Sequence, residues 1–107
     1  MNGRSIYYHV PVHSLIKDIR YYLDLGVNFE IYINSDFIDN HNQDSIELIN
    51  REFAKVKAAK RIHGPFLDLA PASSDTRIRN LSKQRMLSGL RVCKALGCDN
   101  IVLHSHY

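Results

Sequence analysis

K-R-I-H-G-P-F, residues 60–66, and N-I-V-L-H-S-H-Y, residues 100–107, share one pattern, a short apolar run that ends in a histidine. These histidines, His63 and His104, stand where a β-strand would pass into a loop. A histidine at the end of a buried run is costly unless its ring nitrogens have partners. The carboxyl ends of parallel strands form the rim on which α/β proteins build their sites. We therefore expect both histidines at one rim, sharing a metal ion or a substrate.

Strand-like runs alternate with helical periods along the whole chain. The expected strands are residues 6–10, 29–33, 59–63 and 101–103. The expected helices are residues 14–25, 44–56 and 75–96. A β-α-β-α-β-α-β order with right-handed crossovers predicts four adjacent parallel strands with the helices on one face.

Helix ends and buried stripes support these assignments. Asp44 with Glu47 forms a potential capping box, and Gly26 and Gly97 are expected to stop the first and last helices. Apolar residues at helical spacing predict the faces that turn to the core. They are Ile46, Ile49, Phe53 and Val56 in the second helix, and Ile78, Leu81, Met86, Leu90, Cys93 and Leu96 in the third.

Two α/β architectures fit this order. A doubly wound sheet is one, but Y-H-V-P-V-H, residues 8–13, stands where a Gly-rich phosphate loop would follow the first strand. The other is an arc of a (β/α)8 TIM barrel. A complete barrel needs ~200 residues or more, so residues 1–107 would be the N-terminal part of a single TIM-barrel domain, apparently truncated. Such a half leaves two sheet edges exposed.

Composition excludes several classes of protein. With 14 basic and 11 acidic residues, the net charge of +3 is too small to indicate a nucleic-acid surface. No apolar stretch approaches the ~20 residues of a membrane span, and the first residues do not form a signal peptide. We therefore expect a cytoplasmic protein. Cys93 and Cys98 lie five residues apart, which is neither a redox nor a zinc spacing, so we expect them to serve packing.

Four stretches together resemble the xylose-isomerase-like TIM barrels. They are H-V-P-V at residue 9, H-G-P-F-L-D-L-A-P at residue 63, A-L-G-C at residue 95 and N-I-V-L-H-S-H-Y at residue 100. That superfamily includes sugar-phosphate isomerases and epimerases and phosphodiesterases of the AP endonuclease family 2 type. The similarity covers the whole chain but only the N-terminal half of the family's fold.

The resemblance implies that His63 and His104 bind a divalent metal such as zinc or manganese in the intact barrel. Two imidazoles alone bind metal poorly, and the family's remaining ligands come from later strands. We therefore expect an isolated half to be inactive, with its metal site empty. His106 could replace His104 as a ligand or belong to a loop. Asp68 could orient a ligand histidine or cap its own loop.

His9, Glu30 and Phe66 are the candidate substrate-binding residues; the sequence assigns no catalytic residue. His9 matches a pocket histidine of the family, and could orient a hydroxyl or phosphate group or simply stack. Glu30 is a pocket carboxylate if it points inward, but a shift of one residue would turn it toward the helices and a basic partner. Phe66 could line a sugar pocket.

The resemblance thus implies a metal-dependent isomerase or epimerase acting on a small sugar or sugar phosphate. The alternative is a metal-dependent phosphodiester hydrolase acting on nucleic acid. A third interpretation is a non-catalytic half-barrel, which could associate with a second copy through its exposed sheet edges.

Overall fold

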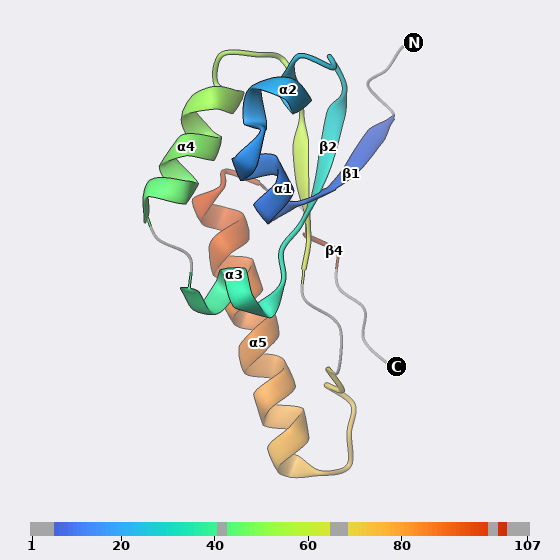
Figure 1. Cartoon of the computed structure of the whole chain (residues 1–107). Coiled ribbons are helices and arrows are strands. Elements are labelled where there is room, and N and C mark those ends of the chain that lie inside the picture. The colour runs from blue at the N-terminus through green and yellow to red at the C-terminus, as the bar shows by residue number, and fades with distance from the viewer. Residues whose placement is uncertain (1–5, 41–42, 65–68, 99–100, 103–107) are drawn as a thin grey trace.

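The computed structural model describes residues 6–40, 43–64, 69–98 and 101–102. Four strands form a parallel sheet in the order β1-β2-β3-β4. Figure 1 shows the helices gathered on one side of this sheet. The predicted α/β class and the parallel β-α order are confirmed. The strands are β1 (Tyr7–Pro11), β2 (Asn28–Tyr32), β3 (Lys60–His63) and β4 (Ile101–Val102).

The core lies between the sheet and the helices. Side chains along a strand alternate between its two faces, and in β1, β2 and β3 the apolar residues of one face are buried, except Tyr8, which is 46% exposed. The strand residues that pack into the core are Val10, Phe29, Ile31 and Ile62, each at most 1% exposed. Each Å² of apolar surface buried in this layer stabilises the fold by ~25 cal/mol.

The first predicted helix is divided in two. Residues 14–25 were expected to form one helix, but α1 (Val12–Lys17) and α2 (Ile19–Leu23) are separated at Asp18. Asp18 has φ −132° and ψ 44°, which is outside the helical region, so the chain bends there. Both short helices still bury apolar residues, Leu15 in α1 and Leu23 in α2. Gly26 follows with φ +70°, as expected of a stop.

The loop predicted between residues 34 and 44 contains a helix, α3 (Ser35–Asn40). The Asn34 side chain accepts a hydrogen bond of 2.9 Å from the Phe37 backbone N–H, which caps the helix start. Phe37 and Ile38 are buried in the core. Tertiary burial thus stabilises a segment whose local sequence is polar and short.

The second predicted helix is α4 (Gln43–Phe53). Ile46, Ile49 and Phe53 are buried as predicted. Asp44 is not the N-cap, because it lies within the first turn. Val56 is also not a core residue: the helix ends at Phe53, and Val56 is 38% exposed.

The last helix, α5 (Thr76–Ala95), matches the prediction closely. The Asp75 side chain caps it by accepting from the Arg77 and Ile78 backbone N–H groups. The expectation that Ile78 and Leu81 face the core is wrong, since they are 46% and 58% exposed. Figure 1 shows why: the N-terminal part of α5 extends beyond the end of the strands that the structure describes.

The C-terminal part of α5 packs as expected. Cys93 and Leu96 are buried, and Gly97 ends the helix with φ +70°. Both thiols hydrogen-bond to backbone carbonyls, Cys93 to Cys98 and Cys98 to Leu96. This agrees with a packing role for both cysteines.

None of the described helices has both the length and the apolar character to cross a membrane.

Candidate metal centre on the open face of the sheet

The face of the sheet opposite the helices carries polar and aromatic side chains, and we call it the open face. Its members alternate with the core residues along β1, β2 and β3, so the register that buries the core also fixes them. In this register His9 pairs with Glu30, and Glu30 pairs with Arg61. The open face includes Tyr7, His9, Glu30, Tyr32, Arg61 and His63.

Three of these side chains converge. His9, Glu30 and His63 each offer one ligand atom, and these atoms lie within 4.8 Å of one another. His9 is exposed, whereas the side chains of Glu30 and His63 are only 17% and 15% exposed. Sequence reasoning named all three residues but assigned only His63 to a metal. His9 lies in the middle of β1, which ends at Pro11, one residue later than the sequence predicts.

Glu30 holds His63 in one orientation. The His63 Nδ1 atom lies 3.0 Å from Glu30 Oε2. An ionised carboxylate only accepts hydrogen bonds, so Nδ1 must carry the proton. In the neutral ring the lone pair is then on Nε2, an atom shielded from solvent. Many metal-binding histidines are oriented in this way by a carboxylate.

Arg61 contacts the other oxygen of the same carboxylate. Its Nε donates a hydrogen bond of 2.9 Å to Glu30 Oε1, and its guanidinium lies 4.0 Å from the centroid of the Tyr7 ring. Burial alone would raise the pKa of Glu30. The hydrogen bonds from Arg61 and His63, with the adjacent positive charge, outweigh burial and lower that pKa below its ordinary value. Glu30 is therefore a carboxylate at neutral pH.

Tyr32 packs against both histidines. Its ring stacks on His9 at a centroid distance of 6.2 Å and meets His63 edge-on at 5.8 Å. Sequence reasoning missed Tyr32 and Arg61 as members of the site. The signal was present in the alternation, because Tyr32 is two residues from Glu30 and Arg61 two residues from His63.

Several predicted site residues lie outside the described residues. They are His104, Phe66, Asp68 and His106. The pairing of His63 with His104 therefore stays a prediction. The alternative in which Glu30 faces the helices is wrong, because Glu30 belongs to the open face. Its basic partner, Arg61, lies on that face too.

The donor set fits a divalent metal ion. Two imidazoles and one carboxylate are the protein ligands of many catalytic zinc sites, which leave a further position open, and of non-haem iron sites. In a tetrahedral site with bonds near 2.1 Å, neighbouring ligand atoms are ~3.4 Å apart. Ligand atoms within 4.8 Å of one another need only move closer by up to ~1.4 Å. Side-chain rotation can supply such a movement.

Fold and site together define a parallel α/β protein with a His/Glu/His cluster on the open face of its sheet. No family model and no curated protein matches the chain. Among solved structures it is similar to the TTHB071 protein from Thermus thermophilus, in a structure soaked with ZnCl2. The TM-score is 0.80 at 25% sequence identity over 94% of this chain. The chain spans 39% of the length of that protein.

Proposed function

We propose that the open face binds a divalent metal ion through His9 and His63, with Glu30 as a third ligand or as the group that orients His63. We further propose that the chain is the metal-binding N-terminal half of a TIM-barrel isomerase or epimerase acting on a sugar or sugar phosphate. The observation that carries the metal site is the convergence of the three ligand atoms within 4.8 Å. The reaction class rests on the resemblance of the sequence motifs.

Each residue of the cluster has a task in this proposal. If Glu30 only orients His63, its hydrogen bond to Nδ1 leaves Nε2 as the donor atom. If Glu30 is itself a ligand, the ion would replace that hydrogen bond and His63 would bind it through Nδ1. Arg61 keeps Glu30 ionised and holds its other oxygen. Tyr32 restricts the rotation of both imidazole rings. A bound ion would supply Lewis-acid polarisation of a substrate carbonyl or hydroxyl oxygen.

Zinc is the first metal to test, for two reasons. The His/Glu/His donor set suits it, and the structurally similar Thermus protein was studied after soaking with ZnCl2. Manganese is the second choice, because the carboxylate donor also suits that ion.

Calorimetric titration of the purified chain with Zn²⁺ tests the metal site. The sequence alone offered two imidazoles and hence an empty site, but Glu30 adds a third donor, so we expect one ion per chain in the wild type. His63→Ala should weaken binding at least tenfold, because even the loss of a group that only orients a ligand costs roughly 10- to 100-fold. His9→Ala should weaken binding as well.

His13→Ala is the matched control. His13 lies in α1 and pairs with Asp36 of α3 at 3.3 Å, and it does not belong to the cluster. Zinc affinity should be unchanged in this variant. If His13→Ala weakens binding as much as His63→Ala, the assigned site is wrong.

Assays of the metal-loaded protein on sugar phosphates and on a phosphodiester then test the reaction class, and cleavage of the phosphodiester would favour the hydrolase.

A further inference from the structure

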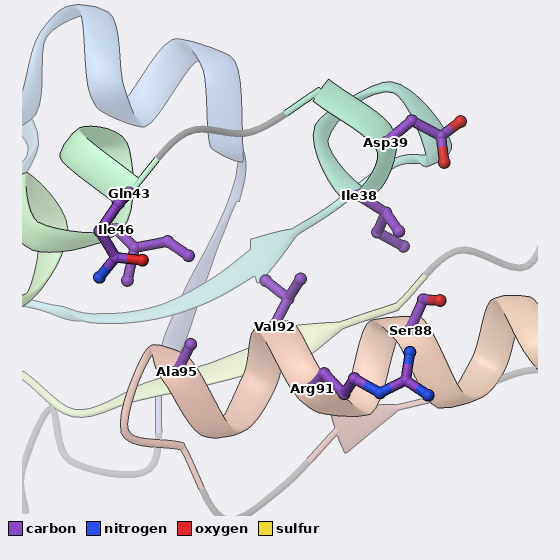
Figure 2. Close-up of a pocket in the computed structure, with 8 residues that line it drawn as sticks. All are labelled: Ile38, Asp39, Gln43, Ile46, Ser88, Arg91, Val92 and Ala95. Atoms are coloured by element: carbon purple, nitrogen blue, oxygen red, sulfur yellow. The ribbon is translucent and has the colours of Figure 1, made fainter.

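A cavity of about 440 Å³ lies between α3, α4 and α5, on the helix side of the sheet. Its apolar wall includes one buried side chain of each helix, Ile38, Ile46 and Val92, all at most 9% exposed, together with the exposed Ala95 of α5. Figure 2 shows Ile38 and Val92 facing each other across the cavity. Pockets of ~300–1,000 Å³ with apolar walls and a few polar groups are typical of small-molecule sites.

The rim of this cavity carries charged side chains, of which one is ion-paired and one is not. Asp39 accepts hydrogen bonds from both terminal nitrogens of Arg85, one of them at 3.1 Å. Hydrogen bonding to Arg85 lowers the pKa of Asp39, so its charge is present but neutralised by Arg85. Arg91 also lines the cavity, and within the described part of the chain it forms no ion pair. Among the described residues of the rim, the positive charge of Arg91 therefore remains uncompensated.

We propose that this cavity binds a small amphipathic carboxylic acid. The hydrocarbon part would contact Ile38, Ile46 and Val92, and the carboxylate would bind the Arg91 guanidinium, whose planar fork matches its two oxygens. The single uncompensated cation fits a monoanion. Because the cavity and the open face lie on opposite sides of the sheet, this site is independent of the proposed metal centre.

Titration of the ¹⁵N-labelled chain with octanoate and with octanamide, followed by NMR, tests the proposal. The two probes share a hydrocarbon tail but differ in charge. We expect octanoate to bind about tenfold more tightly, as a charge-assisted hydrogen bond implies. The amide shifts should centre on α3, α4 and α5. Equal affinity for the two probes, or octanoate shifts centred on His9 and His63, would overturn the proposal.

Three variants locate the site. Arg91→Gln should abolish the preference for octanoate, and Ser88→Phe should abolish binding of both probes by filling the cavity. Ser88 is only partly buried, so a larger side chain can be accommodated without entering the core. Lys83→Gln removes an exposed charge of α5 away from the cavity and should change nothing. A preference that survives Arg91→Gln, or is lost in Lys83→Gln, contradicts the assignment.

Discussion

The Nδ1 atom of His63 lies 3.0 Å from Oε2 of Glu30, on the neighbouring strand. In the sheet register Glu30 pairs with Arg61, two residues before His63. One carboxylate therefore contacts both side chains that β3 contributes to the open face. This makes Glu30 the central residue of the candidate metal centre, whether or not it touches the ion itself.

Glu30→Gln should weaken zinc binding by about 10- to 100-fold. The glutamine amide cannot replace both accepting oxygens, so His63 loses the partner that fixes its tautomer and orientation. Competition for Zn²⁺ with a chromophoric chelator measures the affinity. Glu52→Gln is the matched control, since Glu52 is also a shielded, ion-paired carboxylate but belongs to α4 on the helix side. Equal loss of affinity in the two variants would show a general effect of destabilisation.

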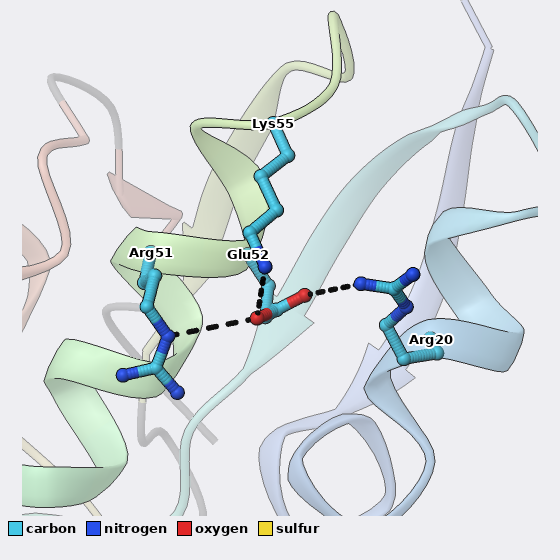
Figure 3. A network of polar contacts seen from close by, with 4 residues as sticks. All are labelled: Arg20, Arg51, Glu52 and Lys55. Atoms are coloured by element: carbon cyan, nitrogen blue, oxygen red, sulfur yellow. Dashed lines mark hydrogen bonds and ion pairs between the residues drawn. The ribbon is translucent and has the colours of Figure 1, made fainter.

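Glu52 joins α2 to α4 and should make stability depend on pH. Figure 3 shows it among Arg20, Arg51 and Lys55. Lys55 and Arg20 donate hydrogen bonds of 2.9 and 3.0 Å to its two oxygens, and Arg51 lies 3.6 Å away. Among the described residues, Asp24 also lines this region. The hydrogen bonds from Lys55 and Arg20 lower the pKa of Glu52 despite its burial.

A pKa that is lower in the folded protein than in the unfolded chain stabilises the fold above the ordinary glutamate pKa. This stabilisation is lost as the pH falls through the lower, folded value. We therefore expect wild type to exceed Glu52→Gln in free energy of unfolding at pH 7, with the difference shrinking below about pH 4.5. Urea denaturation of both proteins between pH 7.5 and 3 measures it. A difference that stays constant over that range would contradict the predicted titration.

The alternation of side chains along the strands and the helical spacing of apolar residues predicted much of this structure, because both patterns lie within short segments of the sequence. F-E-I-Y-I, residues 29–33, alternates so that Glu30 and Tyr32 share a face, and the spacing of Ile46, Ile49 and Phe53 predicts the buried side of α4. Contacts between strands are not local. That Glu30 reaches Arg61 and His63 depends on the register of β2 against β3, which no single segment contains.

The sequence predictions are wrong where the structure depends on contacts between distant segments. The six residues of α3 have little helical pattern, and their burial against the core is a tertiary effect. Of the apolar stripe predicted for the last helix, Cys93 and Leu96 are buried, whereas Met86 and Leu90 are only half-buried. The pattern cannot predict how far the sheet extends beneath the helix. The N-terminal part of α5 extends beyond the described strands (Figure 1), and Ile78 and Leu81 are exposed.

Two substitutions by alanine compare a buried residue of the sheet with an exposed residue of α5. Ile62 is 0% exposed in the centre of the sheet, so Ile62→Ala should cost about 2–5 kcal/mol of unfolding free energy through lost burial and a cavity. Leu81 is 58% exposed, so Leu81→Ala should change that free energy by less than about 0.5 kcal/mol. Urea denaturation of both variants gives the two values. A cost for Leu81→Ala comparable to that of Ile62→Ala would mean that the N-terminal part of α5 is covered in solution.

Substitution of Gly26 measures how much a left-handed backbone conformation costs in free energy of unfolding. Its φ of +70° lies in the left-handed region, and a Cβ built at this position meets nothing within 4 Å. Gly26→Ala should therefore destabilise the protein by backbone strain alone, roughly 1–2 kcal/mol. Asparagine adopts this region more readily than alanine, so Gly26→Asn should recover part of the loss. Urea denaturation orders the three proteins as wild type, then Gly26→Asn, then Gly26→Ala. If Gly26→Ala were as stable as wild type, the turn between α2 and β2 would have to adopt a different conformation in solution.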